Sequence, residues 1–490
     1  MSKNYDIVQK LWNLCDVLRD DGINYSDYVT ELVLLLFIKM EFENTESGIL
    51  QAHKLPDYAR WPALTALSGL NLLKHYRATL LKLSESDDLL IAAIYADAQT
   101  SLKEPRHLEQ LIKSLDAIDW FSAKQDGLGD LYEGLLEKNA SETKSGAGQY
   151  FTPRPLIDSI IHLIKPQAGE TIQDPAAGTA GFLIAADSFI RSRTDNLYDL
   201  SEKQRSFQRN RAFLGMELVT STRRLALMNC LLHGMEGDDE GVIHLGNTLG
   251  SAGASLPKCD ISLSNPPFGT AKGGGGPTRD DLTFATSNKQ LAFLQHIVRH
   301  LKDGGRAAVV LPDNVLFEAG VGAEVRRDLM DKCRLHTILR LPTGIFYAQG
   351  VKTNVLFFQK VSQAATGSTQ KVWVYDMRAN APKFGKRTPL TRGHFAEFEA
   401  AFGDDPNGPA KGRVDQGEAG RFRAFTREEI RTARGDSLDI AWLKDDSVED
   451  AADLPEPAVL ARAAVDELNG ALIELEAILA ELGEAKALDE

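Results

Sequence analysis

Residues 170–191 read ETIQDPAAGTAGFLIAADSFIR, and this stretch decides the fold class that the sequence predicts. A short run that ends at Asp174 is typical of a β-strand, and from Thr179 apolar residues recur at the spacing of an α-helix. The glycines between strand and helix let the backbone approach a ligand where a Cβ would collide. Taken alone, such a turn is as often structural as ligand-binding, so the rest of the chain has to decide.

The alternation of strand and helix continues from residue 149 to about residue 376. Strands are predicted at residues 170–174, 212–217, 242–245, 260–264, 306–311, 335–341, 354–359 and 372–376. Helical patterns lie between them, for example at residues 179–191 and 288–301. This alternation predicts an α/β fold of the Rossmann-like type, with a mostly parallel sheet covered on both faces. In such sheets ligands bind beyond the carboxyl ends of the strands.

Two further regions flank the predicted sheet. Apolar residues recur at helical spacing between Ile7 and Met40, which predicts a helical N-terminal domain at residues 1–145. The catalytic domain is then expected at residues 146–380, and a C-terminal extension at residues 381–490. The extension carries an apolar stripe at Val465, Leu468, Leu472, Leu475, Leu479 and Leu482. The stripe indicates a helix packed on its own domain or, as we predict, a partner-docking helix.

Composition indicates a globular protein of more than one domain. The chain has 490 residues, 43% of them hydrophobic and 25% charged. The apolar run at residues 32–38 is too short to span a bilayer, and the N-terminus has no signal-peptide pattern. The four cysteines are far apart in the sequence and form no CxxC pair. We therefore expect free thiols in a reducing cytoplasm, with no disulfide and no metal site.

The net charge of −14 is concentrated at one end of the chain. Residues 436–490 contain 16 acidic and 3 basic residues, which leaves the rest of the chain close to neutral. A neutral body neither supports nor excludes binding to DNA. It does predict that this chain alone grips DNA weakly, because neutralisation of phosphates supplies most non-specific affinity.

Two carboxylates end predicted strands. Asp174 can hold the ammonium of a methionine moiety, and Glu217 can accept hydrogen bonds from both ribose hydroxyls of a nucleoside. Their separation exceeds the usual ~20 residues of dinucleotide folds, so residues 191–211 would have to be an insertion. An exposed glutamate is weak evidence alone, and Glu217 gains weight only from the neighbouring motifs.

Residues 260–268, DISLSNPPF, carry the most specific chemistry. The strand ends at Asn265, and Pro266, Pro267 and Phe268 follow. The prolines remove donors and leave rigid carbonyl acceptors near the asparagine amide. The Asn265 oxygen and the Pro266 carbonyl can accept the two hydrogens of an amine on an aromatic ring, which directs its lone pair at a sulfonium methyl group. Phe268 offers a face on which an extruded base can stack.

Two neighbouring segments are less specific. Residues 149–154, QYFTPR, suit a segment that covers a cofactor, or equally a turn that joins two domains. Residues 269–279 contain four consecutive glycines and predict a mobile loop. That loop either closes over the site or is a passive linker.

In this order, the motifs resemble the N6-adenine DNA methyltransferases, and more narrowly the methylation (M) subunit of type I restriction-modification systems. The resemblance covers almost the whole chain and rests on the QYFTPR opening, DPAAGTAGF, GMEL, NPPF and LPTGIF at residues 341–346. NPPF alone is shared with cytosine-N4 and protein-glutamine methyltransferases, whereas the opening joined to DPAAGTAGF is far more specific. The resemblance implies an S-adenosylmethionine-dependent methyltransferase fold and methylation of a base-flipped adenine in double-stranded DNA.

The resemblance also implies the site residues. Those that line the S-adenosylmethionine pocket would be Gln149, Tyr150, Phe151, Thr152, Pro153, Arg154, Gly178, Thr179, Ala180 and Glu217. Asp174 would lie at the methionine end, and Asn265, Pro266 and Phe268 would bind the target adenine. Where the family often carries an acidic residue that contacts the cofactor adenine, this chain has Asn247, whose oxygen can accept the same hydrogen bond.

The resemblance implies partners as well. No segment after the catalytic core resembles a base-reading domain, and in these systems recognition lies in a separate specificity (S) subunit. Two methylation subunits would join each specificity subunit, and a restriction (R) subunit would join for cleavage. The near-neutral body and the C-terminal stripe fit that dependence.

Two alternatives stay open at this point. The acceptor could be a glutamine side chain in a protein or an amine in RNA, because both present planar NH2 groups like that of adenine. The large helical N-terminal domain and the glycine loop favour a nucleic acid. The chain could also be a scaffold that has lost catalysis, against which intact Asp174, Glu217 and NPPF argue.

Overall fold

The computed structural model describes residues 3–20, 22–23, 28–48, 52–118, 120, 128–142, 151–269, 279–346, 351–361, 367–382, 384–385, 388–408 and 411–443. The chain divides into two units after Leu443. The predicted partner-docking helix lies outside the described residues, as do Gln149, Tyr150 and nearly all of the predicted glycine loop.

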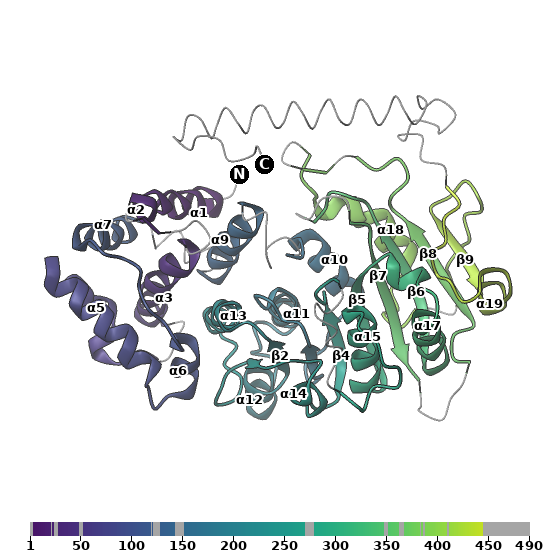
Figure 1. Ribbon diagram of the computed structural model, residues 1–490, viewed down its shortest axis with the longest axis horizontal. Helices are drawn as coiled ribbons and strands as arrows, with labels where there is room; N and C mark the ends of the chain where they lie inside the picture. Colours follow the sequence, from purple (N-terminus) through teal and green to yellow (C-terminus); the bar gives the residue numbers. More distant parts are fainter. Residues whose placement is uncertain are drawn as a thin grey trace, which may run out of the picture. The chain divides into compact units, whose positions relative to one another are not determined.

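The N-terminal region is helical, as predicted (Figure 1). Its elements are α1 (Lys3–Asn13), α2 (Cys15–Asp20), α3 (Tyr28–Glu46), η2 (Asp57–Ala59), α4 (Trp61–Thr65), α5 (Gly69–Ser84), α6 (Leu89–Tyr95), α7 (Pro105–Asp116) and α9 (Leu128–Glu142). The apolar run at residues 32–38 lies in α3 and is inaccessible to solvent throughout. It forms the centre of a helical core, and no helix among the described residues is long and apolar enough to cross a bilayer.

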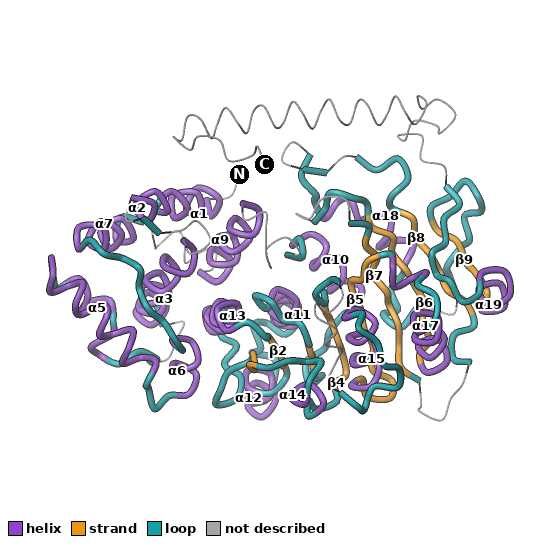
Figure 2. Tube along the Cα trace, viewed as in Figure 1, coloured by secondary structure: helices purple, strands orange, loops and turns teal. Residues whose placement is uncertain are grey.

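The second region is built on a twisted mixed sheet (Figure 2). Its strands are β1 (Ile172–Asp174), β2 (Phe213–Glu217), β3 (Ile243–Leu245), β4 (Cys259–Ser264), β5 (Leu301–Pro312), β6 (Cys333–Leu341), β7 (Thr353–Lys360), β8 (Lys371–Asp376) and β9 (Phe422–Thr426). They lie in the order β3-β2-β1-β4-β5-β7-β6-β8-β9. Only β7 and β9 run against the rest, so the expectation of a mostly parallel sheet is confirmed.

Helices cover both faces of this sheet, again as predicted. They are α10 (Arg154–Ile164), α11 (Gly181–Ser192), α12 (Glu202–Asn210), α13 (Thr220–Leu232), α14 (Ser251–Ala254), α15 (Lys289–His300), α16 (Asn314–Phe317), α17 (Val321–Lys332), η5 (Arg392–Phe395), α18 (Ala396–Phe402) and α19 (Arg427–Arg434). Alternate residues of β5 separate the two cores: Val310 joins the core with α10, α11, α13 and α18, whereas Val309 joins the core with α15, α16, α17 and α19.

The strand order places the chemistry at the centre of the sheet. From β1 the chain moves outward to β2 and β3, and it then returns to add β4 on the other side of β1. The direction of strand addition therefore reverses between β1 and β4, and the carboxyl ends of two neighbouring strands leave a crevice at such a point. Asp174 is the last residue of β1 and the NPPF segment follows β4, so this topology brings the predicted motifs together.

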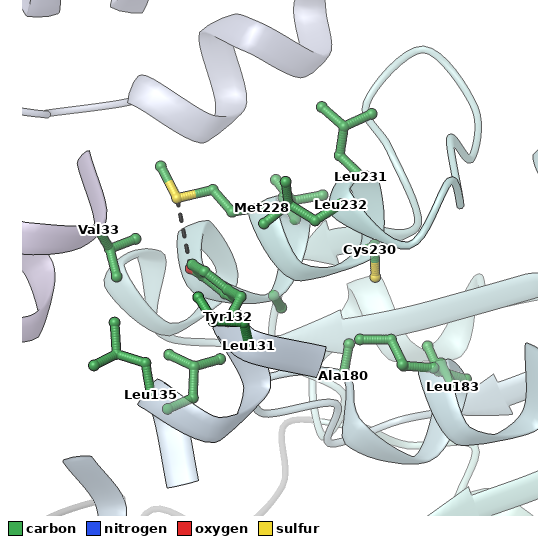
Figure 3. Close-up of a cluster of buried hydrophobic side chains, with 14 of the residues drawn as sticks. Val33, Leu131, Tyr132, Leu135, Ala180, Leu183, Met228, Cys230, Leu231 and Leu232 are labelled. Carbon is green, nitrogen blue, oxygen red and sulfur yellow. Dashed lines mark hydrogen bonds between the residues drawn. The ribbon is translucent and has the colours of Figure 1, made fainter. Parts of the chain in front are cut away.

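The helical region and the sheet share one continuous hydrophobic core. Figure 3 shows Leu131, Tyr132 and Leu135 of α9 beside Met228 of α13, and the Tyr132 hydroxyl lies 3.6 Å from Met228 Sδ. Buried Arg224 of α13 donates to the carbonyls of residues 94 and 96 at the end of α6. Helix α9 is thus fixed directly against the region that holds the sheet.

One strand, β9, was not predicted from the sequence. β9 lies beyond the predicted domain boundary at residue 380 and pairs with β8 in antiparallel register. Its sequence, FRAFT, is short and carries an arginine between its two aromatic residues, which is a weak strand signal. Its pairing is decided by the exposed edge of β8 and by burial of Phe422 against Trp373, whose rings stack at 4.8 Å.

We expect Gly215→Ala to destabilise the protein by about 1–3 kcal/mol, because overpacking of a close contact forces neighbouring atoms apart. A Cβ at Gly215 would lie 2.5 Å from Ile243 Cδ1 and 2.9 Å from Ala177 Cβ, in the turn after β1. Chemical denaturation measures the change as a lower midpoint. Gly393→Ala is the control, because its Cβ would meet only Thr391 Oγ1 at 3.7 Å. Equal midpoints for both variants would contradict this packing.

Candidate active site

A buried hydrogen bond joins the carboxyl ends of β1 and β4. The Ser264 hydroxyl donates to Asp174 Oδ1 at 2.8 Å, and the backbone N–H of Ala176 donates to the same oxygen at 3.0 Å. Asp174 is only 1% exposed, and this burial raises its pKa to about 7 although both hydrogen bonds oppose the rise. These contacts give Asp174 a positioning role between two motifs, and its predicted contact with a methionine moiety stays a prediction.

The turn after β1 depends on two unusual backbone conformations and one helix. Gly178 has a φ of +54° and Ala180 a φ of +70°, in the left-handed region that residues with a Cβ rarely adopt. Asn229 of α13 supports the turn, because its Nδ2 donates to the Thr179 carbonyl at 3.0 Å. The turn is therefore held in its shape by a polar side chain that is itself 1% exposed.

β2 places Glu217 beside the same turn. Its Oε2 accepts the backbone N–H of Gly178 at 3.0 Å, and its Oε1 accepts that of Val219 at 2.9 Å. Burial raises the pKa of Glu217, and the backbone hydrogen bonds oppose that rise. Each carboxylate oxygen keeps a second acceptor site. The geometry is thus compatible with the predicted contact to two ribose hydroxyls.

The NPPF segment meets the QYFTPR segment. Asn265 Nδ2 donates to Thr152 Oγ1 at 3.0 Å, across 113 positions of sequence. Among the residues that follow, Pro266 is buried, Pro267 is exposed and Phe268 is half-buried. The two segments that the sequence marked separately therefore form one site, at the carboxyl end of β4.

A pocket of about 230 Å³ lies beside these segments. Four residues predicted from the sequence line it: Phe151, Thr152, Arg154 and Thr179. Gly178, Ala180 and Pro153 shape the surrounding backbone without lining the pocket. The remaining lining residues are Asp130, Glu133, Gly134, Leu136, Glu137, Ile157, Gly181 and Asn229.

The sequence-based prediction missed the contributions of α9 and α13. Asn229 interrupts the apolar stretch ALMNCLL, and a polar residue inside a buried helix face signals a specific hydrogen bond. The acidic residues of α9 recur at positions 130, 133 and 137, which lie on one face of a helix. That spacing is equally typical of a solvated helix, so only the packing shows that they face a pocket.

Asn247 lies in the exposed turn after β3, as its position in the sequence suggests. Its Oδ1 accepts the backbone N–H of Leu249 at 2.9 Å, which is the geometry of an Asx-turn. The oxygen retains a second acceptor site. Its contact with the cofactor adenine stays a prediction.

Comparison with known proteins decides the family. Residues 123–438 match the N-6 DNA Methylase family. The chain belongs to this family. Residues 7–115 of this methylase match the HsdM N-terminal domain, which lies in the region that the structure describes as helical.

The methylase has full-length relatives. It is 53% identical to the type I restriction enzyme EcoKI methylase subunit of Escherichia coli K12, over 99% of this chain and 97% of the relative. Identity to the StySPI methylase subunit of Salmonella potsdam is 52% with the same coverage. The crystal structure of the EcoKI M protein aligns with 98% of this chain and 97% of that chain, at a TM-score of 0.59 and 49% identity.

These findings confirm the predicted enzyme class. The methylase is an S-adenosylmethionine-dependent methyltransferase that acts on adenine N6 in DNA, and the resemblance to type I methylation subunits is confirmed. A glutamine or RNA amine as the acceptor is not supported. The roles of the individual residues stay predictions.

We expect Glu217→Ala to weaken cofactor binding about 10-fold to 100-fold, because it removes hydrogen bonds to a charged acceptor worth about 1.5–3 kcal/mol. Calorimetry with S-adenosylhomocysteine and the isolated chain measures the dissociation constant. Glu85→Ala, at an exposed helix end, is the matched control and should bind as wild type does. An unchanged affinity of the Glu217 variant would rule out the ribose contact.

Proposed function

We propose that this methylase is the methylation subunit of a type I restriction-modification enzyme, and that Asn265, Pro266 and Phe268 bind an adenine flipped out of double-stranded DNA. The observation that supports this proposal most directly is the 3.0 Å hydrogen bond between Asn265 and Thr152. It joins the segment suited to hold an amine to the segment that lines the pocket. The site that holds the methyl-accepting amine and the pocket that holds the cofactor must be adjacent for direct transfer of the methyl group.

The pocket fits part of S-adenosylmethionine. Asn229 lines it, and its buried Oδ1 has no hydrogen-bond partner among the described residues, so the site offers an acceptor that a ligand can use. The cofactor supplies an electrophilic methyl group on a sulfonium. Of the residues that line the pocket, Phe151, Thr152, Arg154 and Thr179 would hold it. Glu217, Asn247, Gln149 and Tyr150 are further cofactor-binding residues that the family resemblance implies.

Asn265 provides the acceptor for the target amine. Its Nδ2 is committed to Thr152 Oγ1, and this contact orients the amide so that Oδ1 can accept from an adenine amine. The Pro266 carbonyl accepts the second hydrogen, in a segment whose backbone the two prolines restrict. Two neutral acceptors stabilise the positive charge that develops on the amine during transfer. No strong general base is required, because the proton leaves after transfer.

Phe268 binds the ring of the target base. Phe268 is half-buried and follows directly after the two prolines, so its aromatic side chain is suited to stacking on a base beside them. Stacking of a base on an aromatic side chain contributes roughly 1–3 kcal/mol. That gain offsets part of the cost of extruding the adenine from the duplex, which is a few kcal/mol.

The methylase acts in a complex with DNA and other subunits, as is typical of type I methylase subunits. We assign DNA recognition to a specificity subunit, with a second methylation subunit alongside and a restriction subunit for cleavage. The net negative charge lies almost entirely in residues 436–490, and the rest of the chain is close to neutral. This charge distribution supports a dependence on a partner subunit for binding to DNA. A cytoplasmic location belongs to the same proposal.

Methyl transfer from labelled cofactor to unmodified DNA tests this function, with and without the specificity subunit. We expect label on adenine N6 only when both proteins are present. We expect Asn265→Ala to lower the transfer rate at least about 100-fold, the typical loss for one transition-state acceptor or donor, and to change cofactor affinity little.

Asn71→Ala, on an exposed face of α5, is the matched control and should methylate at the wild-type rate. A wild-type rate for the Asn265 variant would remove the amine-binding role. Label on protein or RNA in cell extract, with none on DNA, would contradict the proposed substrate and leave the cofactor site standing.

A further inference from the structure

Helix α9 presents one face to the pocket and the other to the protein core. Leu131, Tyr132 and Leu135 are buried against neighbouring helices (Figure 3). Asp130, Glu133 and Glu137, at helical spacing from one another, line the pocket. A wall of the cofactor pocket is therefore acidic, and it belongs to a helix whose position is set by its apolar face.

The three carboxylates of this wall differ in their partners. Glu133 forms an ion pair with Arg154, whose Nε also donates to Asp158 Oδ1 at 3.0 Å. Asp130 lies 3.7 Å from His233 Nε2. Glu137 has neither a hydrogen bond nor an ion pair within the part of the chain that the structure describes. It is the carboxylate of this wall that is left for a ligand.

A carboxylate without a counter-charge in a half-buried pocket wall raises the free energy of the folded protein. Burial raises the pKa of Glu137, the neighbouring Glu133 adds to the rise, and Arg154 opposes it. A partly buried charge without a partner costs free energy that a bound cation recovers. The feature thus favours a ligand that brings a positive group into the pocket.

Arg154 offers the complementary charge. A guanidinium has five donors, and Arg154 uses Nε and Nη1 on Asp158 and Glu133. Nη2 takes part in no hydrogen bond among the described residues and remains for an anion. The two carboxylates hold the guanidinium in place, which leaves Nη2 oriented to donate a charge-assisted hydrogen bond to an anion.

We infer that α9 recognises the amino-acid end of the cofactor: Glu137 binds its α-ammonium, while Arg154, positioned by Glu133 and Asp158, binds its α-carboxylate. The inference rests on the proposed function, because it assigns which end of S-adenosylmethionine enters this pocket. Asn229 Oδ1, buried and without a partner in the described residues, is a second acceptor for the same ammonium.

The assignment replaces Asp174 as the residue that holds the ammonium. Asp174 is 1% exposed, does not line the pocket and already accepts two hydrogen bonds. Glu137 lines the pocket and accepts no hydrogen bond from the residues that the structure describes. A cofactor bound this way would also contact α9, the last helix of the N-terminal helical region, so this region would take part in cofactor binding directly.

Calorimetry with two ligands tests the inference on the isolated full chain. S-adenosylhomocysteine carries the amino-acid end, and methylthioadenosine lacks it. We expect Glu137→Gln to weaken S-adenosylhomocysteine binding about 10-fold or more and to leave methylthioadenosine binding within about 2-fold of wild type, because only the first ligand brings an ammonium. Glu85→Gln, at an exposed position, should change neither affinity.

Equal losses for both ligands would show a structural role and overturn the inference, as would an unchanged affinity for S-adenosylhomocysteine. A second measurement needs no variant and uses the wild-type protein. An S-adenosylhomocysteine analogue without the α-amino group should bind to it about 10-fold or more weakly than S-adenosylhomocysteine does. Equal binding of the two would overturn the ammonium contact. If wild type bound neither S-adenosylhomocysteine nor methylthioadenosine, the proposed cofactor site itself would fail, which no Glu137 result alone would imply.

Discussion

The site depends on a buried hydrogen bond of 2.8 Å between Ser264 and Asp174, at the end of two neighbouring parallel strands. A carboxylate in the interior must be hydrogen-bonded, because desolvation without a partner costs several kcal/mol. Asp174 meets this need by accepting from β4 on one side and from the turn after β1 on the other. The same contact therefore holds the NPPF segment and the DPAAGTAGF turn in one fixed relation.

Around that contact, each further motif is connected by one specific polar interaction. Glu217 accepts from the Gly178 backbone, Asn229 donates to the Thr179 carbonyl, and Asn265 donates to Thr152. These bonds tie β2, α13 and the QYFTPR segment to the turn after β1. A methyltransferase needs such rigidity, since transfer is fast only where donor and acceptor are held in line before reaction.

The helical N-terminal region is part of this arrangement. Its core is continuous with one face of the sheet, through α3, α9 and α13. Because α9 packs on α13 with its apolar face, its acidic face is placed at the pocket. The polar and apolar faces of one amphipathic helix thus connect the helical core with the pocket. This helix lies within the N-6 DNA Methylase match at residues 123–438 and packs against the region of the separate match at residues 7–115.

The sequence alone determined the strand–helix alternation, the strand ends that carry Asp174, Glu217 and Asn265, and the family. These are local signals: period-two and helical spacing, glycine turns and short motifs are encoded within a few neighbouring residues. The strand β9 was not predicted, because its pairing depends on the exposed edge of β8 and not on its own sequence pattern.

Only the tertiary structure decided which distant residues meet. The contact of Thr152 with Asn265 spans 113 positions, and that of Ser264 with Asp174 spans 90. The sequence did not show that Asp174 is buried and hydrogen-bonded, or that Glu137 faces the pocket without a partner among the described residues. Helical spacing marks which residues of α9 share a face, but whether that face meets water or a ligand depends on what packs beside it, and packing partners are chosen by the whole chain.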